Sequence, residues 1–381
     1  MGAMKETDIL IDTKVVGSGS QVFVIAEMGL NHDGSVHQAE KLIDAAAEAG
    51  ADAVKFQSYR ADHLMIPSRD AYAMLGEVSE STYQTLRRCE LSWESQEKLK
   101  KHADRRDILF MSTPFDEESV DFLDSLGTPV FKISSSDITH APLLRRIASK
   151  KRPIFLSTGM SFLSEVADAL WILRSAGAEE ILLMHCVSSY PALPQHMNLR
   201  ALETMQSYFE LPVGLSDHSE GILFALIAVA LGAVVIEKHF TLDKNAPGSD
   251  HRASMDPADL RELVQNLRKV EASLGDGRKK PADLEEESRL FGRRSVVAAV
   301  DIRSQEKIAP WMLDFKRPGS GLEPRYAEKI AGMMARRNID KDTILQWEDL
   351  APSMSSDPGH DIKRRLDEDK GHANSANRRG L

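Results

Sequence analysis

Eight short apolar runs recur between about residue 22 and residue 240, and amphipathic stretches fill the gaps between them. The runs are largely apolar at both odd and even positions, a pattern typical of strands buried on both faces of a parallel sheet. We therefore predict strands over residues 22–28, 53–57, 108–112, 130–134, 154–158, 181–186, 213–216 and 234–240.

Helix-boundary signals support this alternation of strands and helices. Ser35 followed by Gln38 is typical of a helix start, and Gly50 stands where that helix should end. Asp256 before Pro257 predicts the start of the last helix in the series. Eight strand–helix units in a row predict an α/β fold, a (β/α)8 TIM barrel over residues 21–275.

A doubly wound open sheet is the competing architecture. It would normally carry a glycine-rich phosphate loop after its first strand, and residues 27–31 (Glu-Met-Gly-Leu-Asn) do not form one. Outside the barrel we expect, by composition, four further parts. These are an N-terminal extension (1–20), a charged linker (276–294), a small β-rich domain (295–352) and a disordered tail (353–381). Within the small domain we expect a strand at 295–299, a tight loop at 316–321 and a short helix at 330–334.

Composition narrows the classes of function. The 381 residues carry a formal net charge of -10 without a basic block, which argues against binding to nucleic acid. The apolar stretch 221–236 is shorter than the roughly 20 residues of a membrane span. We interpret it as a buried helix followed by a buried strand. Cys89 and Cys186 have no metal-ligand or disulfide spacing, and residues 1–20 lack a signal-peptide core, so we expect a cytoplasmic protein.

Polar residues stand at the carboxyl end of every predicted strand, where TIM-barrel enzymes place their active sites. Because side chains alternate along a strand, Ser216 and His218 share one face, and Glu237 and His239 share another. The seventh and eighth strands are neighbours in a barrel, so both imidazoles could reach one divalent ion such as Mn, Fe or Zn. The alternative is that each histidine caps its own strand end through backbone hydrogen bonds.

Two lysines, Lys55 and Lys132, lie on buried strands, where an unpaired charge is costly. One interpretation is a salt bridge to Glu27 or Asp137. A second is a clamp on a phosphate or carboxylate ligand, and a third is a Schiff-base lysine. The clamp is favoured because several hydroxyls converge with the two cations, namely those of Thr113, Ser135, Ser157 and Ser216.

Eight short motifs follow one another along the chain. They are residues 26–34 (Ala-Glu-Met-Gly-Leu-Asn-His-Asp-Gly), 55–57 (Lys-Phe-Gln), 112–115 (Ser-Thr-Pro-Phe), 132–133 (Lys-Ile), 156–160 (Leu-Ser-Thr-Gly-Met), 214–218 (Gly-Leu-Ser-Asp-His), 237–240 (Glu-Lys-His-Phe) and 316–319 (Lys-Arg-Pro-Gly). Their order resembles that of the sialic acid synthase family, which includes N-acetylneuraminate synthases and their relatives for legionaminic and pseudaminic acids. The resemblance runs from about residue 22 to residue 350, and the small domain resembles the antifreeze-like (SAF) domain of the family.

The resemblance implies a reaction and a set of roles. The reaction condenses phosphoenolpyruvate with an open-chain N-acetylated hexosamine, giving a nonulosonate and phosphate. By position, His218 and His239 match metal ligands, usually for manganese. Residues matching phosphoenolpyruvate contacts are Lys55, Thr113, Lys132, Ser135, Ser157 and Ser216, and those near the sugar are Glu27, Tyr190 and Asp250. Glu27 is also the candidate to position or deprotonate a water.

Arg317 matches an arginine that the small domain of one subunit delivers into the barrel of its partner, which implies a domain-swapped homodimer. Two positions near the expected sugar pocket depart from the family pattern. Ser188 stands where some members carry Asn, and Asp137 where others carry Glu. The alternatives to this function are a different phosphoenolpyruvate-condensing barrel, which would lack the small domain, and a non-catalytic glycan-binding relative.

Overall fold

The computed structural model describes residues 8–66, 82–248 and 250–353. The chain divides into two compact units, Met1–Gly277 and Arg278–Leu381, and each is described by itself. The tail predicted over residues 353–381 lies, beyond Ser353, outside the described residues.

Unit 1 is a barrel of eight parallel strands in the order β5-β4-β3-β10-β9-β8-β7-β6, with β5 and β6 side by side where the ring closes. This confirms the predicted (β/α)8 fold. The strands are β3 (Phe23–Glu27), β4 (Ala53–Ser58), β5 (Leu109–Pro114), β6 (Phe131–Ile133), β7 (Ile154–Ser157), β8 (Ile181–Cys186), β9 (Val213–Asp217) and β10 (Val235–His239).

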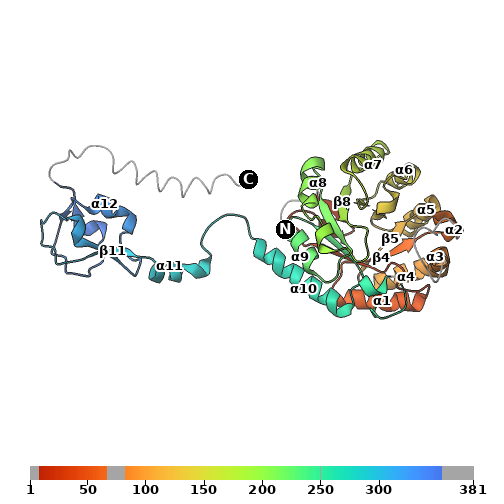
Figure 1. Ribbon diagram of the computed structural model, residues 1–381, viewed down its shortest axis with the longest axis horizontal. Helices are drawn as coiled ribbons and strands as arrows, with labels where there is room; N and C mark the ends of the chain where they lie inside the picture. The colour runs from red at the N-terminus through yellow and green to blue at the C-terminus, as the bar shows by residue number, and fades with distance from the viewer. Residues whose placement is uncertain (1–7, 67–81, 249, 354–381) are drawn as a thin grey trace. The chain divides into compact units, whose positions relative to one another are not determined.

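Helices follow the strands and surround the barrel (Figure 1). They are α1 (Val36–Ala49), α2 (Ala61–Leu64), α3 (Thr82–Cys89), α4 (Trp93–Arg105), α5 (Glu117–Leu126), α6 (Ala141–Ala148), α7 (Leu163–Ser175), α8 (Ala201–Phe209), α9 (Leu223–Ala230) and α10 (Pro257–Leu274). The predicted boundary signals are confirmed. Ser35 accepts a hydrogen bond from the backbone N–H of Gln38, Gly50 ends α1 with a φ of 90°, and Asp256 caps α10.

The apolar stretch 221–236 forms α9 and the first two residues of β10, but the expectation that its helix is buried was wrong in part. Leu223 is 59% exposed and Ile227 is 39% exposed, because only one face of an outer-ring helix packs on the barrel. Among the described residues, none of the helices has the length and apolar character that a membrane crossing requires.

The expected N-terminal extension contains a folded hairpin. Strands β1 (Ile9–Ile11) and β2 (Lys14–Val16) pair antiparallel. The apolar side chains of Ile9, Ile11 and Val16 join a buried cluster with residues of the barrel strands, so the barrel has a dry apolar layer that the hairpin helps to cover.

Unit 2 contains its own small core and short strands. Strand β11 (Ser295–Ala298) pairs antiparallel with β12 (Leu313–Lys316), and β13 (Met334–Ala335) pairs with β14 (Leu350–Ala351). The expected linker includes helix α11 (Glu286–Gly292). The helix predicted at 330–334 was misplaced. Helix α12 spans Ala327–Ile330, and Met334 lies in a strand, because cross-strand pairing overrides local preference there.

Candidate active site

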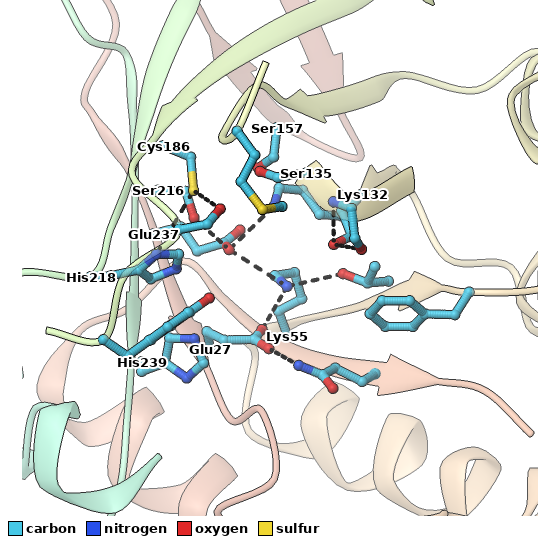
Figure 2. A pocket seen from close by; sticks show the side chains of 18 residues that line it. Glu27, Lys55, Lys132, Ser135, Ser157, Cys186, Ser216, His218, Glu237 and His239 are labelled. Carbon is cyan, nitrogen blue, oxygen red and sulfur yellow. Dashed lines mark hydrogen bonds and ion pairs between the residues drawn. The ribbon is translucent and has the colours of Figure 1, made fainter. Parts of the chain in front are cut away.

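A cavity of about 340 Å³ opens at the carboxyl ends of the barrel strands (Figure 2). Each of the eight strands contributes at least one residue to the lining, in chain order Glu27, Lys55, Thr113, Lys132, Ser157, Cys186, Ser216 and Glu237, and β4 and β10 add Gln57 and His239. Most of the site residues expected from the sequence therefore meet in one place. Further lining residues come from the loops that follow the strands, including Ser135, Ser188, Tyr190 and His218.

Strand register explains which of these side chains touch. Glu27 is paired with Lys55 on β4 and with His239 on β10, and Glu237 is paired with Ser216 on β9. Residues in register on adjacent parallel strands point to the same face, here the barrel interior. The site is thus a consequence of alternation within strands combined with register between them.

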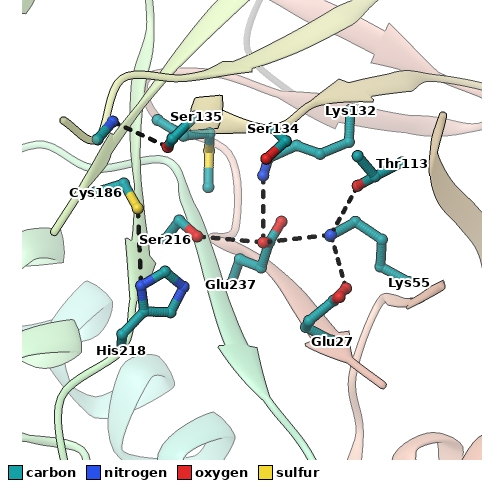
Figure 3. Close-up of polar contacts among 12 residues, drawn as sticks. Glu27, Lys55, Thr113, Lys132, Ser134, Ser135, Cys186, Ser216, His218 and Glu237 are labelled. Carbon is teal, nitrogen blue, oxygen red and sulfur yellow. Dashed lines mark hydrogen bonds and ion pairs between the residues drawn. The ribbon is translucent and has the colours of Figure 1, made fainter. Parts of the chain in front are cut away.

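The two lysines are embedded among carboxylates. The Nζ of Lys55 lies 2.7 Å from the Oε2 of Glu27 and donates to the Oγ1 of Thr113 at 3.0 Å. The Oε1 of Glu237 lies 3.5 Å from Lys55 and 3.3 Å from Lys132 (Figure 3). The salt bridge to Glu27, one of the alternatives from the sequence, is therefore present, whereas Asp137 pairs with neither lysine among the described residues.

Glu237 was not among the predicted site residues, although its position two residues before His239 put it on the same face. It contacts both lysines and accepts a hydrogen bond from the Ser216 hydroxyl at 3.2 Å. Its other oxygen, Oε2, is buried without a hydrogen-bond partner within residues 8–66, 82–248 and 250–353. The cavity therefore holds two carboxylates, Glu27 and Glu237, and two lysines, Lys55 and Lys132, so the number of acidic side chains equals the number of lysines.

Burial and neighbouring charge shift these groups in different directions. Burial raises the pKa of Glu27 and outweighs the opposing charge of Lys55. Burial would also raise the pKa of Glu237, but Lys132 and Lys55 together lower it. Burial lowers the pKa of Lys132, whereas for Lys55 the two carboxylates outweigh burial and raise the pKa. Glu237 is therefore the more firmly ionised of the two carboxylates.

The expected hydroxyls line the cavity, and they differ in whether they have a hydrogen-bond partner. Ser135 accepts from the backbone N–H of Gly159 at 3.0 Å, and Ser216 is bonded to Glu237. The Ser157 hydroxyl is buried and has no hydrogen-bond partner among the described residues. A buried polar atom without a partner is costly, so its presence in a cavity points to a ligand that would supply one.

The two histidines lie side by side at the edge of the cavity, with ring centroids 5.4 Å apart. His218 bonds through its Nδ1 to the backbone oxygen of Val187 at 2.9 Å, which leaves Nε2 available to a metal. The Nδ1 of His239 is buried, and none of the described residues forms a hydrogen bond with it. No group of three or more His, Cys, Asp or Glu suited to a metal occurs in the described part of the chain, so this pair would need water or substrate oxygen to complete a shell.

The residues expected near the sugar are only partly brought together. The Tyr190 ring packs at a tilt against the His218 ring, with centroids 4.1 Å apart, and both Tyr190 and Ser188 line the cavity. Asp250 lies behind the mouth, with its Oδ2 3.8 Å from the Nδ1 of His239. Asp137 does not line the cavity. It accepts a hydrogen bond from its neighbour Ser136, and burial raises its pKa.

Arg317 belongs to unit 2, in the loop that follows β12. It is exposed and has no hydrogen bond or ion pair with any described residue.

Comparison with known proteins assigns the barrel. Residues 42–279 match the NeuB family, and residues 293–351 match the SAF domain. The chain belongs to the NeuB family. The N,N'-diacetyllegionaminic acid synthases of Legionella pneumophila and Campylobacter jejuni are 43% and 42% identical, over 88% and 86% of this chain and 96% and 99% of their own lengths. The human N-acetylneuraminate-9-phosphate synthase is 33% identical over 87% of this chain and 94% of its own. This NeuB-family chain is accordingly an enzyme of the sialic acid synthase type.

Solved structures agree with this assignment. The N-acetylneuraminic acid synthetase of Leptospira borgpetersenii, crystallised with citrate, has a TM-score of 0.68 and 35% identity over 74% of this chain and 94% of its own. A truncated 3-deoxy-D-arabino-heptulosonate 7-phosphate synthase from Thermotoga maritima has a TM-score of 0.57 and 18% identity, covering 71% of this chain and 93% of its own. At that identity the likeness shows a shared barrel fold and no more.

Proposed function

We propose that this chain condenses phosphoenolpyruvate with an open-chain N-acetylated hexosamine, releasing phosphate and forming a sialic-acid-type nonulosonate. The observation that carries this proposal is the meeting of Lys55, Lys132 and several hydroxyls in one cavity beside two histidines. The methylene carbon of phosphoenolpyruvate bonds to the aldehyde carbon of the sugar. Water then adds at C2 of the phosphoenolpyruvate portion, and phosphate leaves with cleavage of the bond between C2 and the phosphate oxygen.

The lysines and hydroxyls account for the phosphoenolpyruvate half of the site. Lys55 and Lys132 hold its carboxylate and phosphate and offset the charge that grows on the leaving group. Ser157 supplies a hydroxyl that has no partner within the described residues, and Thr113, Ser135 and Ser216 add others. Because Glu237 already contacts both lysines, the incoming anion must share them with it or displace it.

His218 and His239 are proposed to hold a divalent metal, with manganese as the expected ion. When bound, such an ion polarises the aldehyde oxygen as a Lewis acid. The two imidazoles fit this assignment because they lie on adjacent strand ends, 5.4 Å apart, and the His218 ring is held by the Val187 carbonyl. Glu27, whose pKa is raised by burial, is proposed to position or deprotonate the water that adds at C2.

The sugar is proposed to lack a phosphate on its far end. Lys55 and Lys132 are the lysines that line the cavity, and no arginine lines it among the described residues. A second phosphate would need its own basic cluster. The identities of 42–43% to legionaminic acid synthases, against 33–34% to 9-phosphate synthases, favour a diacetamido sugar as substrate.

The enzyme is further proposed to work as a homodimer in which Arg317 of one subunit completes the cavity of the other. What supports this is the exposed guanidinium in unit 2, which has no partner among the described residues. Tyr190 at the mouth is 55% exposed, as expected of a site that another segment covers.

Phosphate release from phosphoenolpyruvate tests the proposal, measured with N-acetylmannosamine, its 6-phosphate and a diacetamido-trideoxy hexose. We expect release only with an amino sugar, fastest with the diacetamido sugar, and a product whose mass equals the sugar plus pyruvate. Lys132→Ala serves as the inactive control. Release without sugar would contradict the condensation, and a preference for the 6-phosphate would contradict the sugar assignment.

A further inference from the structure

The segment behind His239 holds a carboxylate close to a metal-ligand candidate. The Oδ2 of Asp250 lies 3.8 Å from the Nδ1 of His239, which is buried and has no hydrogen-bond partner in the described part of the chain. A shift of about 1 Å would close this gap to a hydrogen bond. Histidines that bind a metal commonly donate their second N–H to a carboxylate, which fixes the tautomer and the ring orientation.

Asp250 is held by Ser254 through its backbone carbonyl, and its Oδ2 also accepts from the backbone N–H of Leu30 at 3.4 Å. Ser254 donates to the Asp250 carbonyl at 2.6 Å, and Asn31 donates to the Ser254 hydroxyl at 2.9 Å. Asn31 is 1% exposed and also donates to the Phe240 carbonyl at 2.9 Å. The loop after β10 is thereby tied to the loop after β3, and the Asp250 side chain is directed toward His239.

Gly29 has no side chain, and this allows the Asp250 carboxylate and the His239 ring to lie close to each other. Its φ is 48°, and a Cβ built on it would lie 2.8 Å from the Asp250 Oδ2 and 3.0 Å from the His239 Nδ1. The carboxylate is the end of a rotatable side chain, so a methyl group at residue 29 would push it away from the imidazole. Only glycine allows the two groups to keep their present positions.

We propose that Asp250 is a positioning residue for His239, that it accepts the Nδ1 proton so that Nε2 faces the metal, and that Gly29 keeps the space for this contact. This inference rests on the proposed metal function. It differs from a role in sugar contact alone, because a sugar contact would leave metal affinity without sugar unchanged.

Titration of the sugar-free protein with Mn²⁺, followed by the electron paramagnetic resonance signal of the unbound ion, separates the two roles. We expect Asp250→Ala to weaken Mn²⁺ binding about 10- to 100-fold. Gly29→Ala is expected to act in the same direction. Asp250→Asn keeps an acceptor oxygen and is expected to fall between Asp250→Ala and wild type.

Gly127→Ala is the matched control, because Gly127 also has a positive φ, 76°, but no atom within 4 Å of the added Cβ. Its Mn²⁺ affinity is expected to equal that of wild type. Wild-type affinity in a folded Asp250→Ala protein would overturn the inference and leave the metal assignment intact. Wild-type protein that bound no Mn²⁺ would overturn the metal assignment and this inference with it.

Discussion

The two ends of the barrel interior are built from the same eight strands and have opposite character. Toward the amino ends the buried side chains are apolar, and they include Phe23, Ile25, Met111, Val130, Phe155, Leu182, Met184 and Val235. At the carboxyl ends every strand contributes a residue to the polar cavity, and four of these residues are ionisable lysines or glutamates. Along a strand, the side chain in the apolar layer and the side chain in the cavity are two residues apart, as Phe155 and Ser157 of β7 are.

This difference teaches how the site can concentrate charge. The apolar layer and the β1–β2 hairpin keep water away from below, so charges at the cavity floor are weakly screened and must satisfy one another. Lys55, Lys132, Glu27 and Glu237 do this in pairs. The apolar layer of the barrel interior therefore lies at one end and the chemistry at the other, and substitutions at the two ends should have separable effects.

The largest expected effect is at the polar end, on removal of the metal. A chelator should lower turnover by at least about 10³-fold, because a Lewis-acid metal supplies several kcal/mol of transition-state stabilisation. Added Mn²⁺ should restore wild-type activity but not that of His218→Ala. Phosphate release is the measurement, and full turnover in excess chelator would exclude the metal site.

Completion of the polar end by a second subunit gives the next effect. Arg317→Ala and Lys55→Ala should each be inactive, and mixtures of the two should recover activity. With random exchange in equal amounts, half of the dimers are mixed and each has one intact site, so about a quarter of wild-type activity is expected. Subunit exchange is verified with differently tagged chains. No recovery after verified exchange would show that the site is completed within one chain.

A matched pair on β7 tests the comparison directly, because Phe155 and Ser157 share a face and belong to different layers. Phe155→Ala should lower the free energy of unfolding by about 3–5 kcal/mol, with the KM for phosphoenolpyruvate unchanged. Ser157→Ala should leave stability nearly unchanged, since its hydroxyl has no partner, and raise that KM about tenfold. Denaturant unfolding and steady-state kinetics give both values. Equal effects of the two substitutions on KM would remove the distinction between the layers.

The smallest expected effect concerns pH. Burial, with the neighbouring charge of Lys55, lowers the pKa of Lys132 below its ordinary 10.5, so Lys132 loses its proton early as pH rises. Phosphoenolpyruvate binding should then weaken at alkaline pH. Between the lowered pKa of Lys132 in the folded protein and its ordinary value of 10.5, the unfolded chain holds a proton on this lysine that the folded chain has lost. Lys132 therefore makes the free energy of unfolding rise with pH in this range.

The kcat/KM for phosphoenolpyruvate against pH measures this alkaline loss, and thermal unfolding over the same range measures stability. Lys132→Arg, which keeps its charge, should move the loss to higher pH. An alkaline loss at the same pH in this variant would assign it to another group.

The sequence by itself determined the elements and much of the site. Alternation and two-faced apolar runs identified the eight barrel strands, since burial of a parallel sheet imposes that pattern locally. Strand-end polar residues then pointed to Lys55, Lys132, His218 and His239, because a barrel directs all of these ends to one mouth. The helix starts at Ser35 and Asp256 could also be predicted, because a helix cap depends only on neighbouring residues.

Only the tertiary structure decided which groups touch. Glu237 could be placed on the face of His239 from the sequence, but its contacts with Lys55 and Lys132 depend on register and on packing across the barrel. Asp250 approaches His239 in the space that Gly29 leaves open. Gly29 belongs to the loop after β3 and Asp250 to the loop after β10, and Leu30 and Asp250, which share a hydrogen bond, are 220 residues apart in the chain. Local patterns specify the faces of strands and the ends of helices. Distances between side chains on different strands are set by how the ring closes, and no local pattern carries that information.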